Sequence, residues 1–340
     1  MDPINIDKLV RRPVVAVMGA HPADFADLSE QLARHATLII EPDRSDLARV
    51  DAALAWQDTH LDRELLSLAP RLAVVTHLGT AVHVDVDVAS ELGIVVLGNA
   101  GHNGISVAEH TIGLLLALAK RILRSDRIVR TRTDWLVGTP ELVNQELYDK
   151  TLGLLGFGFV GRHVARIAGA GLGMNVIVFE KFEETVREAG YEPVGLDELL
   201  ERADVVSVHL PLTPETHHLL DERRFAQMKS TALLVHTARG EVVDYDALNA
   251  ALRNGTIAGA AFDTWPHHRA NPDSPLIDLK NVVMTQHNAG LTQESAQRMA
   301  DAVVNGIWEV LADQKPTASH MLNPEVWNRR RRLGHNDGKS

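Results

Sequence analysis

A glycine-rich segment near the middle of the chain, TLGLLGFGFVG at 151–161, restricts the possible fold more than any other feature. A short apolar run precedes the glycines, and a helical pattern, RHVARIAGAG, follows them. In that order Gly156 allows a tight turn, Gly158 lets the backbone approach a diphosphate, and Gly161 lets a helix pack closely on a strand. The N–H groups at the start of the helix can then bind the anion. The segment therefore predicts a strand–turn–helix unit that binds a dinucleotide.

Glu180 stands nineteen residues past Gly161, at the end of the next predicted strand. A carboxylate at this place can accept hydrogen bonds from both ribose hydroxyls and repel a 2′-phosphate, so NAD is favoured as the cofactor. Lys181 follows directly and could pair with that phosphate. The sequence therefore leaves NADP open as the alternative.

Short apolar runs bounded by polar or turn residues alternate with helical patterns along the whole chain. The predicted strands are 14–19, 37–41, 52–56, 72–76, 93–97, 151–156, 175–180, 204–210, 232–237, 257–263 and 281–285. Because the runs are continuously apolar, the sheets are expected to be parallel and covered on both faces. A chain of 340 residues exceeds the usual size of one core. The predicted fold class is α/β, with two Rossmann-like domains, one flavodoxin-like and one dinucleotide-binding, and a cleft between them.

The helical patterns set the expected domain boundaries. A helix that is apolar almost all round is predicted over 106–123, as a spine between the domains, with a polar surface connection after it. A second helix, 293–313, should return the chain to the first domain. We expect a substrate (catalytic) domain of residues 1–102 plus 292–328, an NAD-binding domain of residues 103–291, and a flexible tail, 329–340, that begins with four arginines.

Composition excludes several other functions. The net charge is 34 − 45 = −11, which argues against a nucleic-acid partner. The chain has no cysteine, so disulfides and thiolate chemistry are excluded. The longest apolar stretch, 112–119, is too short for a membrane span, and the N-terminus lacks a signal-peptide pattern, so a cytoplasmic protein is expected. No metal-ligand spacing is evident, and no metal site is predicted.

Seven motifs are specific in combination. They are NGISVAEH (103–110), GFGFVG with Glu180, VHLPLTPET (208–216), HTARGEVVDYDAL (236–248), GAAFDTW (259–265), TQHNAG (285–290) and NPEVW (323–327). With these motifs the chain resembles, over roughly residues 72–325, the D-isomer-specific 2-hydroxyacid dehydrogenases, a group that also includes formate and phosphoglycerate dehydrogenases. The resemblance implies an NAD(P)-dependent oxidoreductase that moves a hydride between nicotinamide and a small D-2-hydroxy or 2-oxo acid.

The resemblance implies that Arg239 anchors the substrate and that His287 is the general acid/base. The chemistry suits both types, because a guanidinium can direct two N–H groups at a carboxylate and an imidazole titrates near neutral pH. It also implies a set of cofactor-binding residues: Gly156, Gly158, Phe159, Val160, Gly161, Glu180, Leu210, Pro211, Thr216, Thr237, Ala238 and Asp263. Here Phe159 and Val160 would present N–H groups to the pyrophosphate, and Asp263 would meet the nicotinamide carboxamide.

The substrate side is implied by two further segments. Gly79 and Thr80 would offer backbone N–H groups to the substrate carboxylate, with His102 and Asn103 nearby. No Arg or Lys occurs in the segment 76–87, which disfavours a phosphorylated substrate. Members of this family pair through the dinucleotide domain, so a homodimer is expected.

His268 is a departure from the family pattern, which usually has a carboxylate there to hold the catalytic histidine and raise its pKa. A neutral imidazole can orient His287 but cannot supply the negative charge. We therefore assign His268 to the catalytic set and expect the essential pKa to be more acidic than in a His–Glu pair. The alternative is that His267 and His268 form a loop pair or contact the substrate.

Two other functions remain open at this point. The motif at 103–110 is closest in style to formate dehydrogenases, which suggests oxidation of a one-carbon acid or an oxyanion. Corepressors that sense NAD(H) also resemble this family and can retain both Arg239 and His287. Turnover of NADH with 2-oxo acids distinguishes an enzyme from a sensor.

Overall fold

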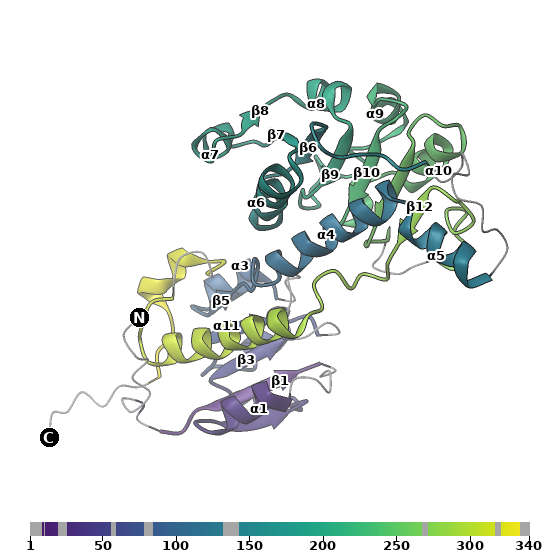
Figure 1. The fold of residues 1–340 in the computed structure, drawn as a ribbon. Coiled ribbons are helices and arrows are strands. Elements are labelled where there is room, and N and C mark those ends of the chain that lie inside the picture. The colour runs from purple at the N-terminus through teal and green to yellow at the C-terminus, as the bar shows by residue number, and fades with distance from the viewer. Residues whose placement is uncertain are drawn as a thin grey trace, which may run out of the picture. The chain divides into compact units, whose positions relative to one another are not determined.

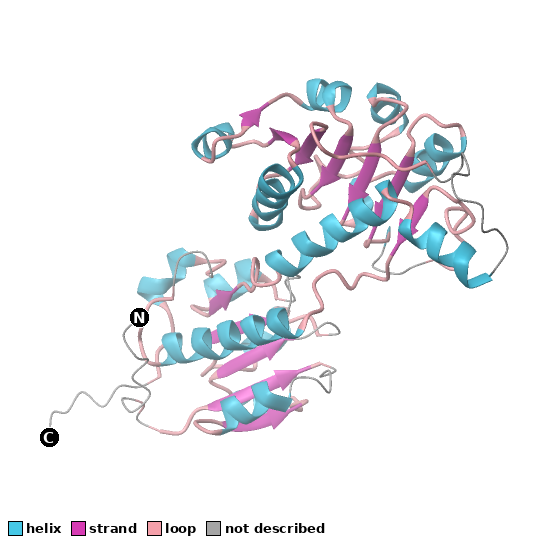
Figure 2. Ribbon diagram, viewed as in Figure 1, coloured by secondary structure: helices cyan, strands magenta, loops and turns pink. Residues whose placement is uncertain are grey.

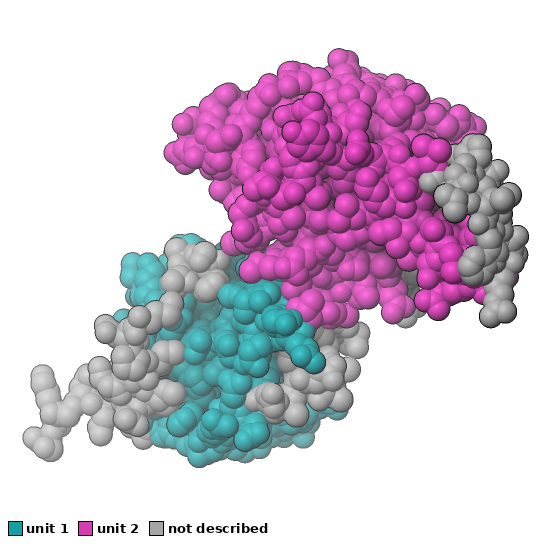
Figure 3. Space-filling view, in the orientation of Figure 1, with its two compact units in different colours: residues 1–103, 293–340 teal, residues 104–292 magenta. Residues whose placement is uncertain are grey.

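The computed structural model describes residues 9, 11–19, 26–55, 59–77, 84–131, 143–266, 271–316 and 321–333. The chain divides into two compact units, residues 1–103 with 293–340 (unit 1) and residues 104–292 (unit 2), coloured separately in Figure 3. Each unit contains a parallel sheet with helices on both faces (Figure 2). The predicted α/β fold class is therefore confirmed. In the described part of the chain, no helix is long and apolar enough to span a membrane.

Unit 1 is built on a five-stranded sheet with the order β2-β1-β3-β4-β5, which is the flavodoxin-like order. Its elements are β1 (Val14–Met18), α1 (Ala26–Ala33), β2 (Thr37–Ile40), η3 (Asp46–Arg49), β3 (Ala52–Ala55), α2 (Arg63–Ser67), β4 (Val74–His77), α3 (Val86–Glu91), β5 (Val95–Leu97), α11 (Gln293–Leu311) and η9 (Pro324–Arg329). Alternate residues of each strand point to opposite faces. Val15 and Val17 of β1 thus pack with α1 and α11, whereas Ala16 and Met18 pack with α2 and α3.

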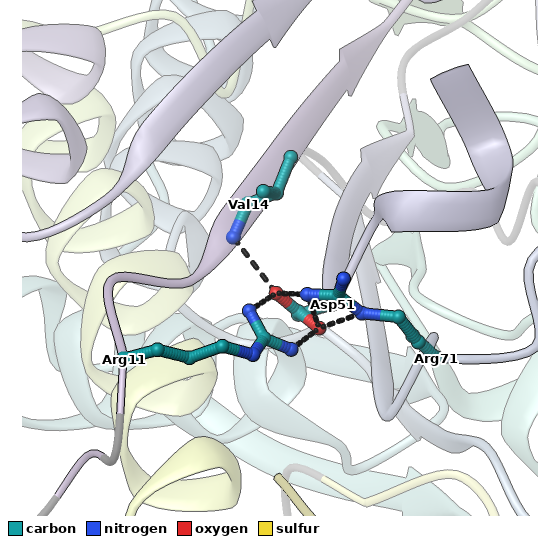
Figure 4. Close-up of polar contacts among 4 residues, drawn as sticks. All are labelled: Arg11, Val14, Asp51 and Arg71. Carbon is teal, nitrogen blue, oxygen red and sulfur yellow. Dashed lines mark hydrogen bonds and ion pairs between the residues drawn. The ribbon is translucent and has the colours of Figure 1, made fainter. Parts of the chain in front are cut away.

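Asp51 closes the amino end of this sheet, just before β3. Its carboxylate is fully buried and accepts hydrogen bonds from both Nη atoms of Arg11 at 2.7 and 2.5 Å, from Arg71 at 3.0–3.1 Å, and from the N–H of Val14 at 2.9 Å. Figure 4 shows the two guanidinium groups on either side of the carboxylate. A buried carboxylate needs such partners, because desolvation without them is costly.

The C-terminal segment differs from the sequence prediction of a tail from residue 329. Arg331 donates its N–H to the carbonyl of Gly93 at 2.8 Å, the Arg330 guanidinium lies 3.4 Å from the centroid of the Trp327 ring, and Leu333 is buried in the core. The prediction is therefore wrong for residues 329–333. The arginine stems cover apolar surface while their polar groups find carbonyl and carboxylate partners, a combination that a count of charges does not reveal. Residues 334–340 lie outside the described residues.

The NPEVW motif has a structural role in the same unit. Asn323 is 1% exposed, and its side-chain oxygen accepts from the N–H of Val96 at 2.8 Å while its amide donates to Ile94 O at 2.9 Å. These bonds satisfy the backbone of edge strand β5, which would otherwise be left unpaired.

Unit 2 is built on a seven-stranded sheet with the order β12-β11-β10-β9-β6-β7-β8, and all described strand pairs are parallel. Its elements are α4 (Gly104–Ala119), α5 (Ile122–Thr131), β6 (Thr151–Leu155), α6 (Phe159–Arg166), η5 (Ile167–Gly171), β7 (Asn175–Phe179), α7 (Glu183–Glu188), β8 (Glu192–Pro193), α8 (Leu196–Arg202), β9 (Val205–Val208), α9 (Glu222–Gln227), β10 (Leu233–His236), η6 (Gly240–Val242), α10 (Tyr245–Arg253), β11 (Gly259–Phe262) and β12 (Val282–Met284). The pattern missed only the two-residue edge strand β8 among these strands.

Two helical layers cover the sheet of unit 2 (Figure 1). Helices α4 and α6 share an apolar core with one face, and α8, α9 and α10 share a core with the other. The single helix predicted over 106–123 is in fact two helices, α4 and α5. Arg121 adopts a left-handed φ of 50° between them, and its Nε donates to Val143 O at 2.9 Å. A residue in that conformation ends a helix, and the tertiary hydrogen bond stabilises it.

Candidate functional site

The predicted cofactor and catalytic residues of unit 2 lie at one edge of its sheet. Gly156 follows β6, Glu180 follows β7, Leu210 follows β9, and Arg239, Asp263 and His287 follow β10, β11 and β12. All these strands are parallel, so their carboxyl ends share one edge. In the sheet order β9-β6-β7, the strands that follow β6 in the chain are added first on one side of it and then on the other, so the strand order reverses beside Gly156. Open α/β sheets bind ligands at such a topological switch point.

The three glycines of the 156–161 turn have distinct surroundings. A β-carbon on Gly156, which has a φ of +100°, would lie 2.8 Å from His209 O, and one on Gly161 would lie 2.3 Å from Gly156 O. Both positions are therefore closed to any side chain. Gly158 has nothing within 4 Å of the same position and is the N-cap of α6, whose first residues are Phe159 and Val160. The turn thus presents open backbone at the start of a helix, which fits a pyrophosphate group.

Glu180 is bound to the same turn. Its Oε2 accepts from the N–H of Phe157 at 2.8 Å, and its Oε1 accepts from the N–H groups of Lys181 at 2.8 Å and Phe182 at 3.4 Å. A carboxylate has about four lone-pair sites, so these three bonds leave acceptor capacity on Oε2. The carboxylate is therefore held in place and can still accept a bond from a ribose hydroxyl.

The loops after β9 and β10 are held by hydroxyl contacts. Thr216 donates to Pro211 O at 2.6 Å and closes the 211–216 turn. Thr237 lies 2.9 Å from the hydroxyl of Thr111 on α4. The segment from Thr237 through Ala238 to Arg239 is thereby tied to the helix that covers this face of the sheet.

Two histidines lie at the ends of the strands that precede these loops: His236, the last residue of β10, is buried, and His209, the residue after β9, is partly buried. Burial lowers the pKa of His209 to about 3 and that of His236 to about 4. Both side chains are therefore neutral at physiological pH, and His236 Nε2 donates to the carbonyl of Arg239 at 3.0 Å. His236 thus fixes the backbone of the arginine predicted to hold the substrate.

Arg239 is half-buried and precedes the short helix η6. Its Nη1 donates to Ala238 O at 2.8 Å. Burial lowers the pKa of Arg239, and the charge of Glu241 opposes that shift. An arginine with a reduced pKa is still charged at neutral pH, so a partly desolvated positive charge lies at the carboxyl edge.

The loop that carries His287 is organised by Asp263. This carboxylate is 1% exposed and accepts from the Thr285 hydroxyl at 2.5 Å, from the N–H of Asn288 at 3.0 Å and from the N–H of Ala289 at 2.9 Å. His287 has a φ of 62°, which costs a non-glycine residue about 1–2 kcal/mol. The bonds to Asp263 on both sides hold that conformation.

Trp265 links the loops that follow β10, β11 and β12. Its indole N–H donates to Thr285 O at 2.9 Å. A β-carbon on Gly240 would lie 2.4 Å from the carbonyl carbon of Trp265, so the residue after Arg239 packs directly on this segment. The three loops form one packed layer at the carboxyl edge.

Several residues in or next to this layer could not be predicted from the sequence. Thr285, Trp265 and His236 were not predicted to belong to the site, and neither was His110 of α4, whose Nε2 lies 3.0 Å from the hydroxyl oxygen of Thr285. All four lie within the motifs that carried the family resemblance, and that position is the only signal the sequence offers.

Other predicted residues are not placed in this layer. Gly79, Thr80 and His268 lie outside the described residues. His102 and Asn103 belong to unit 1, where the backbone oxygen of His102 accepts from Arg298 Nε at 2.8 Å. Among the residues that the structure describes, no three His, Asp or Glu side chains are grouped so that they could hold a metal ion.

Comparison with known proteins identifies the family of the chain. A family model described as D-isomer specific 2-hydroxyacid dehydrogenase, NAD binding domain, matches residues 112–289. The glyoxylate reductase of Aeropyrum pernix is 38% identical over 289 residues, which are 83% of this chain and 85% of that protein. The D-3-phosphoglycerate dehydrogenase of Archaeoglobus fulgidus is 37% identical over 253 residues, which are 74% of this chain but only 47% of that protein.

A solved structure is also similar over most of the chain. The D-lactate dehydrogenase of Aquifex aeolicus, complexed with NAD and lactic acid, has a TM-score of 0.75 and 30% identity, and the match covers 87% of this chain and 94% of that one. The chain therefore belongs to the D-isomer specific 2-hydroxyacid dehydrogenases, and it is an NAD-dependent enzyme of that family.

Proposed function

We propose that the enzyme reduces a small, unphosphorylated 2-oxo acid to the 2-hydroxy acid, as the D isomer wherever the product is chiral, with glyoxylate as the first substrate to test. The observation that carries the proposal is the sheet topology: Arg239, Asp263 and His287 follow three adjacent parallel strands and share the edge where the glycine turn lies. The similarity to a glyoxylate reductase supports the choice of substrate. The lack of Arg and Lys in 76–87 argues against a phosphate group on it.

In this proposal each residue has a separate role. NADH supplies the hydride to the carbonyl carbon of the 2-oxo acid. Arg239 holds the substrate carboxylate with paired N–H groups, and His287 donates a proton to the carbonyl oxygen as negative charge develops there. The balance is one 2-oxo acid, one NADH and one proton to one 2-hydroxy acid and NAD.

The residues of the 156–161 turn would hold the dinucleotide. The N–H groups of Phe159 and Val160 would bind the pyrophosphate, and Glu180 would accept from the ribose. Asp263 has little capacity left for the nicotinamide carboxamide: Oδ1 takes two bonds and Oδ2 one, so a single acceptor site on Oδ2 remains. We therefore assign Asp263 to holding the loop first and to the carboxamide second.

The test is the loss of NADH absorbance when the protein is mixed with NADH and each of glyoxylate, pyruvate, hydroxypyruvate and 3-phosphohydroxypyruvate. We expect the unphosphorylated acids to be turned over, with a kcat/KM at least tenfold above that of the phosphorylated one. A preference for the phosphorylated acid would overturn the substrate assignment. Formate with NAD is run in parallel, because turnover there alone would support the formate alternative.

The expected homodimer is still a proposal. Helix α5 exposes Ile122, Leu123 and Val129, which are each at least half exposed and suit an apolar contact. A solution mass of one chain by light scattering would rule the dimer out.

A further inference from the structure

A chain of hydrogen bonds runs from helix α4 to the loop of His287. His110 Nε2 lies 3.0 Å from the hydroxyl oxygen of Thr285, and that hydroxyl lies 2.5 Å from Asp263 Oδ1. His110 is separated from Thr285 by 175 residues, so the contact is purely tertiary. About a quarter of the His110 side chain is exposed, whereas Asp263 is 1% exposed.

The direction of each bond follows from counting protons. A threonine hydroxyl has one hydrogen, and an ionised carboxylate can only accept. Thr285 therefore donates to Asp263, and its oxygen is left to accept. His110 must then donate from Nε2, because the Thr285 hydrogen is already used. His110 Nε2 is 3.7 Å from Asp263 Oδ1, too far for a direct hydrogen bond.

The consequence for the loop follows from what else Asp263 binds. Its Oδ1 also accepts from the N–H of Asn288 and its Oδ2 from the N–H of Ala289, on the far side of His287. Without the bond from His110, the Thr285 hydroxyl could rotate about its C–O bond and donate elsewhere. The carboxylate would then lose a partner while buried, and the left-handed residue between its partners would lose support.

We propose that His110 is a positioning residue: its Nε2–H sets the direction of the Thr285 hydroxyl, and through Asp263 it holds the loop that presents His287. His110 therefore acts on a loop of the same protein and not on a separate ligand. The expected effect of His110 on catalysis rests on the proposed function of His287. The expected effect of His110 on the loop rests on the hydrogen-bond geometry alone. The two effects are measured separately.

The first measurement is hydrogen–deuterium exchange of the peptide that spans residues 285–291, in the enzyme without substrate. We expect His110→Leu and Thr285→Val to raise exchange of the Asn288 and Ala289 amides about tenfold, because each variant removes one donor from the network. Thr285→Ser keeps the hydroxyl and should exchange like the wild type. His35→Gln, which changes an exposed histidine of unit 1, is the matched control and should leave this peptide unchanged.

The second measurement is the steady-state rate with NADH and the best 2-oxo acid. His110→Leu and Thr285→Val should each lower kcat by about 10–100-fold, with the KM for NADH changed less than threefold, because a misplaced proton donor affects the chemical step. The double variant should be no slower than the slower single variant, since both changes break one chain. Additive losses would overturn the coupling.

Each of the remaining outcomes overturns or supports a stated part of the proposal. Unchanged exchange in His110→Leu overturns the positioning role. Raised exchange with an unchanged kcat overturns the link to His287. A wild-type protein that turns over no 2-oxo acid, while His110→Leu still raises exchange, refutes the proposed function and leaves the positioning role standing. If His110→Leu does not fold, His110→Phe takes its place, because it keeps an aromatic ring but has no Nε2–H to donate.

Discussion

A β-carbon on Gly161 would lie 2.3 Å from the carbonyl oxygen of Gly156, and this contact sets how closely helix α6 can approach strand β6. Real β-carbons do not come so near to a backbone oxygen. The helix would have to move if Gly161 carried a side chain. Gly158, two residues after Gly156, has open space around the same position and is under no such constraint.

Replacing Gly161 should therefore affect stability, whereas replacing Gly158 should affect cofactor binding. Gly161→Ala is expected to destabilise the protein by about 1–3 kcal/mol through overpacking. Gly158→Ala should leave the melting temperature within about 2 °C of the wild type and weaken NADH binding about tenfold, because its methyl group occupies the approach to the backbone. Thermal unfolding and NADH titration test the pair, and a normal NADH affinity in Gly158→Ala would contradict the cradle assignment.

Substitutions of the two proposed catalytic residues should affect different kinetic constants, one the binding of substrate and the other the chemical step. Arg239→Lys is expected to raise the KM for the 2-oxo acid about 10–100-fold, because one ammonium group cannot copy the paired N–H groups of a guanidinium. His287→Gln should lower kcat about 10²–10⁴-fold with the NADH affinity retained, because it removes the proton donor. Arg253→Lys on the exposed face of α10 is the control. Equal effects of the Arg239 and Arg253 changes would refute the assignment of Arg239.

Two histidines whose pKa values are lowered in the folded protein, His209 and His236, should make the protein sensitive to acid. Their pKa values, about 3 for His209 and about 4 for His236, lie below that of an unfolded chain, so the unfolded state binds more protons as the pH falls below about 6.5. Stability from the neutral imidazoles is complete above that pH and is lost as the pH falls toward 4. At pH 5 each histidine should cost about 2 kcal/mol relative to pH 8.

Urea denaturation at pH 8 and pH 5 measures this loss. In His209→Gln the difference between the two pH values should shrink by about 2 kcal/mol, whatever the substitution does to stability at pH 8. The exposed His35→Gln should leave the difference unchanged. An equal pH dependence in His209→Gln and the wild type would show that the pKa of His209 is not lowered in the folded protein.

His268 offers a test that depends on charge alone. We expect His268→Glu to move the essential pKa of kcat/KM upward, because a carboxylate beside His287 stabilises its protonated form. The profile of kcat/KM against pH for the two proteins measures it. No movement would mean that the imidazole at 268 does not neighbour His287, as expected if His267 and His268 form a loop pair.

Asp51 should matter more than an exposed ion pair of the same length. Asp51→Asn removes the charge that Arg11 and Arg71 share and is expected to cost about 3–5 kcal/mol, because two guanidinium groups then face each other without a counter-ion. Glu64→Gln breaks the exposed pair with Arg44, 2.5 Å long, and should cost less than about 1 kcal/mol. Chemical denaturation compares the two, and similar costs would contradict the role of burial.

Much of the fold follows from local patterns, and the exceptions are informative. Each short apolar run that was predicted to be a strand became one, because a segment that is apolar on both sides must be covered on both faces. The predicted helix at 106–123 failed at Arg121, where no glycine or proline marks the break. The hydrogen bond from Arg121 to Val143 O stabilises this break between the helices. No local sequence pattern can predict a contact between residues that far apart. The arginines of 329–333 were predicted to be solvated for the same reason.

The sequence by itself determined the chain's α/β class, its glycine turn and its family, because periodicity, glycine spacing and short motifs are local properties of the residues. Only the tertiary structure decided that Asp263 holds the loop of His287, that His110 reaches that loop from α4, and that His236 secures the backbone of Arg239. The first two contacts join strands and helices far apart in the chain, and the third depends on burial and on a loop conformation. Hydrogen-bond geometry and desolvation exist only once the chain is packed, so no local pattern could have specified them.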